Sequence, residues 1–220
     1  MLIGLFVTGT DTGVGKTLVS AALLHRFRTT PGLRYWKPVQ TGIEADDDTA
    51  EVLRLSSLAD DRALHDGVRL PRPLSPHLSA SLAGASISVA GLIETASRQD
   101  SSVRWIMEGA GGVLVPLNER ELMIDFMTVL GLPVVVAARS GLGTINHTLL
   151  TLEALRARAL PVAGVVLVGP TNVDNRVAIE THGRTAVIGE LNWLDPLTPA
   201  ALQGAAAVIA PGSALDWAFV

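Results

Sequence analysis

The 220-residue sequence has no cysteine, few charged residues (17%) and no long hydrophobic run. Without cysteine, the chain can form no disulfide, thiolate nucleophile or cysteine-ligated metal site. The net charge of −4 offers neither a basic surface for nucleic acid nor a polybasic membrane anchor. The first residues do not resemble a secretory signal, and no apolar stretch is long enough to span a bilayer. These absences predict a cytoplasmic protein whose partners are small molecules, with no nucleic acid and no membrane.

Lysine is nearly absent as well. Of the 17 basic residues 15 are arginine, and the two lysines are Lys16 and Lys37. A lysine ammonium is a compact, mobile point charge that suits phosphates and reacting groups. Chance placement is the simpler alternative, but Lys16 lies in a glycine-rich segment and Lys37 follows a predicted strand. We therefore expect both lysines to be functional.

The glycine-rich segment at residues 8–17 is the strongest signal in the chain. It follows an apolar strand predicted at 2–7 and leads into a helix predicted at 18–24. Gly13 and Gly15 let backbone N–H groups converge on anionic oxygens. Lys16 adds a cation, and the Thr17 hydroxyl can ligate Mg²⁺. A turn that needs glycine only for its geometry would not also require Lys-Thr at the helix start, so the segment predicts a nucleotide phosphate site.

Acidic residues occur at two further places where a ligand is expected. The aspartates at 46–48 precede a helix predicted at 49–58, where they either cap the helix or, through Asp48, reach a metal. Glu108 ends a strand predicted at 102–107 and is followed by three glycines within four residues. Such a loop loses much entropy on ordering, which close approach to a ligand explains better than packing does. Glu108 is therefore predicted to hold the metal directly or through water.

Strands and helices alternate along the rest of the chain. Further strands are predicted at 33–36, 132–138, 162–168 and 186–191, and further helices at 89–98, 121–130, 148–159 and 199–210. Residues 60–84 are expected to be irregular, with a rigid proline-rich surface loop at 70–77, and a last short strand is expected at the C-terminus. The alternation predicts one α/β domain over residues 1–220, with a mostly parallel sheet and helices on both faces.

Four segments occur in a fixed order: GTDTGVGKT at 9–17, KPVQTG at 37–42, EGAGG at 108–112 and GLGTINH at 141–147. Together they resemble the dethiobiotin synthetase family of the P-loop NTPase superfamily, over nearly the whole chain. The resemblance implies that 7,8-diaminopelargonate, CO₂ and Mg·ATP give dethiobiotin, ADP and phosphate in biotin synthesis. It further implies a carbamate on one substrate amine, transfer of the γ-phosphoryl group to it, and ring closure by the other amine.

The resemblance also implies roles for residues of this chain. Lys16 covers the β- and γ-phosphates, Lys37 the carbamate and the migrating phosphoryl group, and Thr12 donates to phosphoryl oxygens. The residues expected around the nucleotide are Thr12, Gly13, Val14, Gly15, Lys16, Thr17, Asp48, Glu108, Gly109, Ala110, Gly111, Gly169, Pro170, Asn192, Trp193 and Leu194.

A metal site, a substrate site and a homodimer follow from the same resemblance. Thr17, Asp48 and Glu108 surround Mg²⁺, while Thr41 and Lys37 hold the diamine or its carbamate. The substrate's carboxylate tail crosses the interface of a homodimer, where Asn146 of the second subunit contacts it. From the residues alone, Asn146 could equally cap the helix predicted at 148–159.

The base pocket departs from the family pattern. Gly169 and Pro170 stand where much of the family has Asn-Asp, and Asn192 stands where a Pro-Trp-Leu segment commonly begins. An asparagine amide can read the edge of adenine, whereas glycine cannot. We therefore expect the enzyme to accept other nucleoside triphosphates nearly as well as ATP.

A protein of a different class is the alternative interpretation. A partition-type P-loop ATPase acts as a nucleotide switch, and such proteins usually carry a second lysine in the phosphate loop and a membrane helix or DNA-binding patch. Residues 10–14 contain no lysine, and no basic or amphipathic tail is visible in the sequence. These features favour the enzyme.

Overall fold

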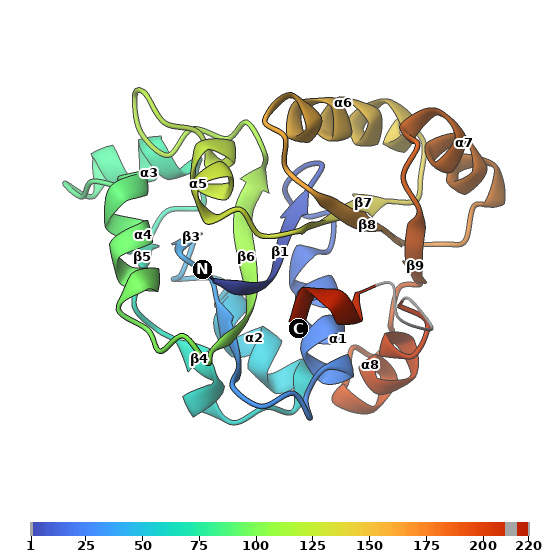
Figure 1. The fold of residues 1–220 in the computed structure, drawn as a ribbon, viewed down its shortest axis with the longest axis horizontal. Coiled ribbons are helices and arrows are strands. Elements are labelled where there is room, and N and C mark those ends of the chain that lie inside the picture. Colours follow the sequence, from blue (N-terminus) through green and yellow to red (C-terminus); the bar gives the residue numbers. More distant parts are fainter. Residues whose placement is uncertain (1, 210–214, 220) are drawn as a thin grey trace.

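The apolar runs of the sequence form a central sheet in the computed structural model, which describes residues 2–209 and 215–219 (Figure 1). The sheet has seven strands in the order β4-β2-β6-β1-β7-β8-β9, and each neighbouring pair is parallel. The strands are β1 (Ile3–Gly9), β2 (Leu33–Trp36), β4 (Ala63–Leu64), β6 (Arg104–Gly112), β7 (Val134–Arg139), β8 (Val162–Val168) and β9 (Val187–Leu191). The predicted α/β class with a mostly parallel sheet is confirmed.

Helices cover both faces of this sheet, as the sequence predicts (Figure 1). One face packs against α1 (Lys16–Arg26), α2 (Asp48–Ser56) and α8 (Pro199–Ala206). The other packs against α3 (Pro76–Leu82), α4 (Val89–Ser97), α5 (Met123–Leu130), α6 (Thr144–Ala157) and α7 (Val173–Gly183). Side chains of β1 alternate between the two cores, with Leu5 and Val7 in the first and Phe6 in the second. Both faces are apolar because a parallel sheet is buried on both sides.

β1 lies where the direction of the strand order reverses. Its neighbours are β6 and β7, and the chain passes from β1 through α1 to β2 on one side and from β6 through α5 to β7 on the other. Ligands of open α/β sheets bind beyond the carboxyl ends of the strands at such a point. The glycine-rich loop connects β1 to α1 there, so the fold places it at the expected position of a ligand.

Residues 60–84 contain structure that the sequence pattern does not predict. β3 (Val39–Thr41) and β5 (Val68–Leu70) form a separate two-stranded parallel sheet, η1 (Asp60–Arg62) leads into β4, and α3 begins at Pro76. The expectation that the whole segment is irregular is wrong, whereas the surface loop expected at 70–77 is present at 71–75, between the end of β5 and the start of α3. Proline suits the first turn of a helix, so a run of prolines concealed a helix start. Leu70 is buried and anchors the segment to the core.

Two expectations for the C-terminal part are also corrected. The sequence does not predict α7, because few of its residues are buried and Val173 and Val177 are exposed, so its apolar periodicity is weak. In place of the expected last strand, Asp216–Phe219 form a 3₁₀ helix, η2. α6 begins at Thr144, earlier than predicted, and α8 ends at Ala206, while residue 210 lies outside the described residues.

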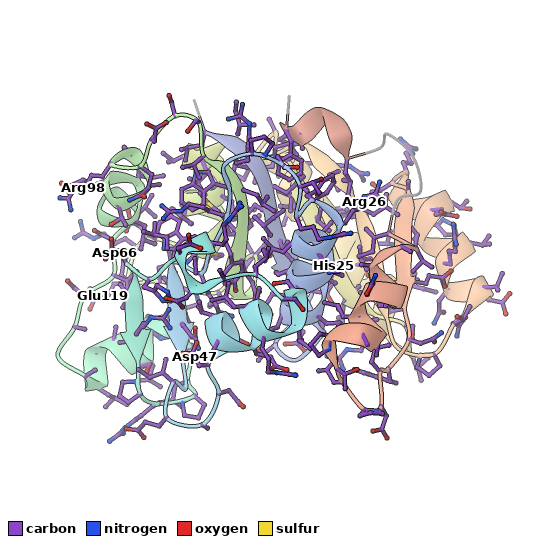
Figure 2. The ribbon with its side chains drawn as sticks, turned by 90° about the horizontal axis from the view of Figure 1, so that it is seen from below. His25, Arg26, Asp47, Asp66, Arg98 and Glu119 are labelled. Atoms are coloured by element: carbon purple, nitrogen blue, oxygen red, sulfur yellow. The ribbon has the colours of Figure 1, made fainter. Side chains whose placement is uncertain are left out.

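Many charged side chains lie on the outside of this architecture, as Figure 2 shows for Asp66, Arg98 and Glu119. None of the helices in residues 2–209 and 215–219 combines the length and apolar character needed to cross a lipid bilayer. Lys37 and Glu108, by contrast, are buried charged residues. Buried charges need partners, and their partners define the site.

Candidate active site

The loop between β1 and α1 has the backbone that its glycines predict. Gly13 and Gly15 adopt positive φ angles of 70° and 95°. A Cβ on Gly15 would lie 2.9 Å from Val168 Cγ1, so this position has no room for a side chain. α1 begins at Lys16, directly after the loop. The N–H groups of the first helical turn have no partner within the helix and can bind an anion there.

Lys16 is held across the loop. Its Nζ donates to the backbone oxygen of Asp11 at 2.9 Å, and its side chain is almost completely buried. The Asp11 carboxylate accepts from the N–H of Thr12 at 2.7 Å and pairs with Arg139 at 2.9 Å. Burial lowers the pKa of Lys16, and the nearby Glu108 carboxylate opposes that shift. These contacts brace the loop around an ammonium group that lines the cavity described below.

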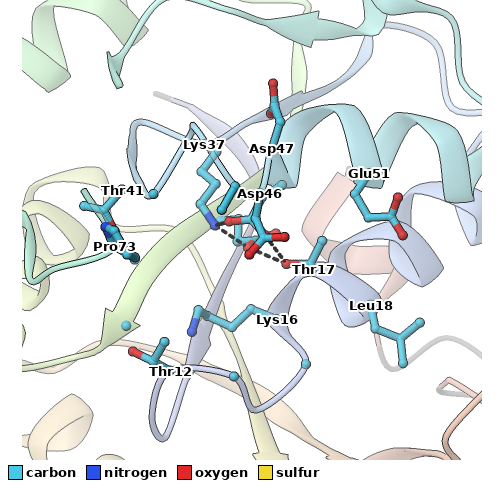
Figure 3. A pocket seen from close by; sticks show the side chains of 18 of the residues that line it. Thr12, Lys16, Thr17, Leu18, Lys37, Thr41, Asp46, Asp47, Glu51 and Pro73 are labelled. Atoms are coloured by element: carbon cyan, nitrogen blue, oxygen red, sulfur yellow. Dashed lines mark hydrogen bonds and ion pairs between the residues drawn. The ribbon is translucent and has the colours of Figure 1, made fainter. Parts of the chain in front are cut away.

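Two acids meet a hydroxyl and an ammonium group beside the loop (Figure 3). Thr17 Oγ1 donates to Asp48 Oδ1 at 2.8 Å and lies 3.3 Å from Glu108 Oε1. Lys37 Nζ lies 2.8 Å from Glu108 Oε1 and also pairs with Asp48 Oδ2. The fold thus brings together four residues that lie far apart in the sequence and that were all predicted to act on the phosphates, the metal or the substrate.

The charges in this group support one another. Burial by itself lowers the pKa of Lys37, but Glu108 and Asp48 outweigh burial and raise this pKa overall. Burial by itself raises the pKa of Asp48, but Lys37 and the hydrogen bond from Thr17 hold it below its ordinary value. The ammonium and the Asp48 carboxylate are therefore both charged at neutral pH.

Strand register explains why Lys37 meets Glu108. Trp36 of β2 is paired with Met107 of β6. Lys37 directly follows β2, and Glu108 follows Met107 within β6, which continues to Gly112 although a strand ending at residue 107 was expected. The two residues therefore lie side by side. Parallel strands end at the same edge of a sheet, which is the edge that holds the phosphate loop.

The sequence left open whether the aspartates at 46–48 cap a helix or bind a metal, and the structure gives these positions to different residues. Asp47 is the N-cap of α2, because its Oδ1 accepts from the N–H groups of Thr49 and Ala50 at 3.0 and 3.2 Å. Asp48, the first residue of the helix, points instead to Thr17 and bonds its hydroxyl. The cap therefore belongs to Asp47, and Asp48 belongs to the site.

Tyr35 is a site residue that the sequence interpretation missed. Its hydroxyl donates to Glu108 Oε2 at 3.0 Å, and the whole side chain is buried. Burial and the neighbouring Glu108 carboxylate raise the pKa of Tyr35 well above its usual value, so the phenol stays protonated. A signal was present, because Tyr35 precedes Lys37 by two residues and strand residues at this spacing share a face.

A cavity of about 1140 Å³ contains these groups. The predicted site residues that line it are Thr12, Gly13, Gly15, Lys16, Thr17, Lys37, Thr41, Asp48, Glu108, Ala110, Gly111, Trp193 and Leu194. The predicted residues that are not part of its lining are Val14, Gly109, Asn146, Gly169, Pro170 and Asn192. Val14 belongs to the core, and a Cβ on Gly109 would lie 3.0 Å from the ring of Phe6.

The cavity has two ends. Thr41 and Pro73 lie on one side of the acids, and Glu51 and Leu18 lie on the other (Figure 3). Pro73 belongs to the segment expected to be a surface loop, so its place in the cavity was not foreseen. A cavity with a phosphate loop between two ends can hold two ligands side by side.

The end near Leu18 is closed by residues that follow β9. Trp193 and Leu194 line the cavity there together with Arg54 of α2, and 63% of the Trp193 side chain is exposed. Gly169 has a φ of 124°, and a Cβ on it would lie 2.6 Å from Ser140 Oγ and 3.5 Å from Trp193 Nε1. The position beside the indole therefore admits glycine alone and offers no side chain to read a ligand's edge.

Asn146 lies apart from this cavity, on the exposed side of α6. Leu142 and Leu150, four residues before and after it, are exposed too. Leu150 and the exposed Leu114 line a second, shallower cavity of about 350 Å³ that reaches Asp11 of the phosphate loop. An apolar surface therefore borders the back of the loop.

Comparisons with known proteins identify the family of this chain. The sequence model of the AAA domain family matches residues 3–201. The ATP-dependent dethiobiotin synthetase BioD of Brucella ovis is 46% identical over 199 residues, which are 90% of each chain. The chain belongs to the dethiobiotin synthetase family. The enzyme class expected from the sequence, an ATP-dependent cyclo-ligase of the P-loop superfamily, is thereby confirmed.

Other similar proteins differ in chain length and in sequence identity. The chain is 51% identical over 193 residues to the biotin biosynthesis bifunctional protein BioCD of Bordetella avium, covering 87% of itself and 40% of that protein. A ParA family ATPase of Chlorobium tepidum superposes with a TM-score of 0.58 at 11% identity, over 100% of this chain and 98% of that one. The MinC:MinD complex of Aquifex aeolicus superposes with a TM-score of 0.57 at 11% identity, over 94% of this chain and 93% of that one. At such identity these structures show the fold alone, so they do not favour a nucleotide switch.

Proposed function

We propose that this chain converts 7,8-diaminopelargonate, CO₂ and ATP to dethiobiotin, ADP and phosphate, with residues 1–220 acting as one domain. The observation that carries the proposal is the meeting of Lys37, Thr17 and two acids beside the phosphate loop, in a cavity with room on either side. The identity of 46% to a dethiobiotin synthetase supports this product.

Thr17, Asp48 and Glu108 fit a magnesium ion. Mg²⁺ prefers oxygen ligands and is usually held by one or two carboxylates together with substrate phosphates. The Thr17 hydroxyl, at the first turn of α1, lies 2.8 Å from the Asp48 carboxylate and 3.3 Å from the Glu108 carboxylate. When bound, Mg²⁺ neutralises the charge that builds up on the phosphates. The donor set therefore supports Mg²⁺ as the cofactor.

The lysines supply the cations that phosphoryl transfer between two anions needs. Lys16, the first residue of α1 after the loop, covers the β- and γ-phosphates, with the Thr12 hydroxyl as a further donor. Lys37 lies between the acids and the end that holds Thr41 (Figure 3), where its ammonium offsets the charge of the carbamate. Thr41 hydrogen-bonds the nitrogens or the carbamate of the diamine. Positioning and electrostatics of this kind account for most of the catalysis in phosphoryl transfer.

We also infer that the protein is a homodimer with its active site at the interface. Leu114 and Leu150 form an apolar surface beside the phosphate loop, and Asn146 lies one helical turn before Leu150 on the exposed side of α6. Exposed apolar patches next to a site mark an interaction surface. In this arrangement Asn146 of the partner subunit receives the carboxylate tail of the diamine. The enzyme works in the cytoplasm, where ATP is made available.

The experiment that tests the function follows phosphate and product together. Phosphate release from ATP is measured with Mg²⁺ and bicarbonate, with and without 7,8-diaminopelargonate, while dethiobiotin is quantified by mass. We expect release that depends on the diamine and equals dethiobiotin mole for mole. Hydrolysis that ignores the diamine and yields no product mass would contradict the proposal and favour the nucleotide switch.

A further inference from the structure

The two oxygens of the Glu108 carboxylate have different surroundings. Oε1 faces the site, where Lys37 Nζ lies at 2.8 Å and Thr17 Oγ1 at 3.3 Å. Oε2 faces away from those two groups and accepts from the Tyr35 hydroxyl at 3.0 Å. Glu108 has no exposed surface at all. One oxygen of the carboxylate, Oε1, is therefore available to ligands, and the other, Oε2, is held by the protein.

The sheet builds this division into its strands. Tyr35 lies in β2, two residues before Lys37, which directly follows that strand. Tyr35 is paired in register with Ile106 of β6, two residues before Glu108. Leu33, Tyr35 and Ile106 belong to the same core, under α1 and α2. The Tyr35 hydroxyl thus reaches Glu108 from the buried side and Lys37 reaches it from the ligand side.

We propose that Tyr35 is a positioning residue, which holds Glu108 Oε2 so that Oε1 alone is presented to the metal as a one-oxygen ligand. The inference rests on the proposed function, because it takes Glu108 as a metal ligand. A carboxylate in a fully buried place is stable only when both oxygens have partners. Lys37 can leave Glu108 when a cation arrives, whereas Tyr35 is packed on all sides and stays. Groups that bond the far side of a metal ligand orient it and tune its affinity.

Without the phenol hydroxyl, Oε2 keeps no donor on the core side. The carboxylate is then free to turn both oxygens toward Lys37, which competes with the metal for them. Tyr35→Phe removes that hydroxyl and preserves the ring. We expect its Mg²⁺ affinity, measured by calorimetric titration in the presence of ADP, to fall by about tenfold to about 100-fold. Ser56→Ala is the matched control: it removes another buried hydroxyl, one that donates to Val52 O at 2.7 Å within α2, and should leave Mg²⁺ affinity unchanged.

A double-mutant cycle with Glu108→Gln tests whether Tyr35 acts through Glu108. We expect Glu108→Gln to weaken Mg²⁺ binding and Tyr35→Phe to add nothing in that background. An equal loss from Tyr35→Phe in both backgrounds would overturn the inference, since the hydroxyl would then act elsewhere. Loss in Glu108→Gln with wild-type affinity in Tyr35→Phe would overturn the inference and leave the proposed function standing. Wild-type affinity in Glu108→Gln would overturn the inference together with the proposed role of Glu108 as a metal ligand, whereas the proposed reaction is tested separately by the phosphate and dethiobiotin assay.

A rescue variant separates positioning from packing. Tyr35 is the sole tyrosine, and 4-aminophenylalanine introduced at codon 35 keeps the ring and restores an N–H donor at the same place. We expect this variant to bind Mg²⁺ more tightly than Tyr35→Phe does, although the two rings pack alike. Affinity as weak as that of Tyr35→Phe, in a variant that unfolds at the wild-type temperature, would overturn the inference. If Tyr35→Phe fails to fold, the 4-aminophenylalanine variant is compared with the wild type instead, and a loss of Mg²⁺ affinity of about tenfold or more in that folded variant would overturn the inference.

Discussion

Lys37 is the residue on which the site depends most, because its ammonium is shared by two acids that have few other cationic partners among the described residues. Its side chain is 6% exposed and that of Glu108 is 0% exposed. Breaking a buried pair by removing one partner typically costs about 3–5 kcal/mol, since an uncompensated charge remains. Lys37 also lines the ligand cavity, so its ammonium is close enough to serve the reaction.

The first prediction concerns Lys37→Ala. We expect it to leave binding of Mg·nucleotide nearly intact, because Lys16 and the loop amides remain, and to lower turnover by about 10²–10³-fold or more. Calorimetric titration with ADP and Mg²⁺ reports binding, and the coupled phosphate and dethiobiotin assay reports turnover. Arg34→Ala is the control, since Arg34 lies in β2, three residues before Lys37, but bonds Gln99 outside the cavity. Wild-type turnover in Lys37→Ala would remove this lysine from the mechanism.

The second prediction separates neighbouring aspartates. Asp47→Ala should cost about 1 kcal/mol in the free energy of unfolding, because it removes an N-cap, and leave Mg²⁺ affinity unchanged. Asp48→Asn should do the reverse and weaken Mg²⁺ binding, because the site loses a charged ligand. Urea unfolding and Mg²⁺ titration of both variants measure the two effects. If neither variant differs from wild type in the titration, neither carboxylate serves the metal.

At the scale of elements, the segments that follow β8 and β9 are the ones expected to hold the nucleotide base. Gly169 follows β8 with no room for a side chain, and Trp193 after β9 offers an exposed indole. Every base has an aromatic face, so stacking on tryptophan does not discriminate among bases, and selectivity needs groups that read their edges. The segment that follows β8 provides no such side chain at Gly169.

The third prediction follows for nucleotide choice. We expect kcat/KM for ATP, CTP and GTP to agree within about tenfold, because stacking, worth about 1–3 kcal/mol per base, is common to all three. Trp193→Ala should therefore raise KM for all three nucleotides to a similar extent. Side-by-side turnover assays measure both effects. A strong preference for ATP would show that a group other than residue 169 reads adenine.

The fourth prediction concerns how the stability that Asp125 gives to helix α5 changes at low pH. Asp125 Oδ2 accepts from the N–H of Leu122 at 2.8 Å, and this bond and the pair with Arg158 hold the pKa of Asp125 below its ordinary value. A lowered pKa contributes stability that is present above the unfolded value of 3.8 and is lost as pH falls through the folded value. We expect Asp125→Ala to cost about 1 kcal/mol at pH 7 and less at pH 3. Urea unfolding at both pH values checks this, and an equal cost at both would contradict it.

At the scale of the whole molecule, the apolar surface beside the phosphate loop is the feature that a monomer does not explain. Leu142 is fully exposed, and Leu114 and Leu150 are each more than half exposed. This surface borders the loop that holds Lys16, so a second copy seated there would complete the diamine site. The proposed dimer therefore links assembly to substrate binding.

The fifth prediction tests that link. Leu150→Asp should shift the protein toward a monomer in analytical ultracentrifugation, because it puts a charge into an apolar contact. It should raise KM for the diamine and leave nucleotide binding unchanged. Val129→Asp is the matched control, since Val129 is also exposed but lies on α5. A dimer that persists in Leu150→Asp, or a monomer with wild-type KM for the diamine, would contradict the proposed interface.

Local pattern was sufficient for the phosphate loop and for the central strands. The positive φ angles of Gly13 and Gly15 depend on residues that are adjacent in the chain. The same is true of the apolar runs that form β7 and β8. It was insufficient for α3, whose start is hidden among prolines, and for α7, whose buried face is narrow. Their helical state depends on what packs against them, and a sequence window does not contain that.

The chemistry of the site was likewise predictable only in part from the sequence. A cation after one strand and an acid at the end of another could be expected at one edge of the sheet, because parallel strands end together. Tertiary structure alone decided which aspartate of 46–48 points into the site and which oxygen of Glu108 bonds Tyr35. It also decided that Gly169 lies beside Trp193. Those facts are distances between elements remote in sequence, and they are set by register and packing when the sheet assembles.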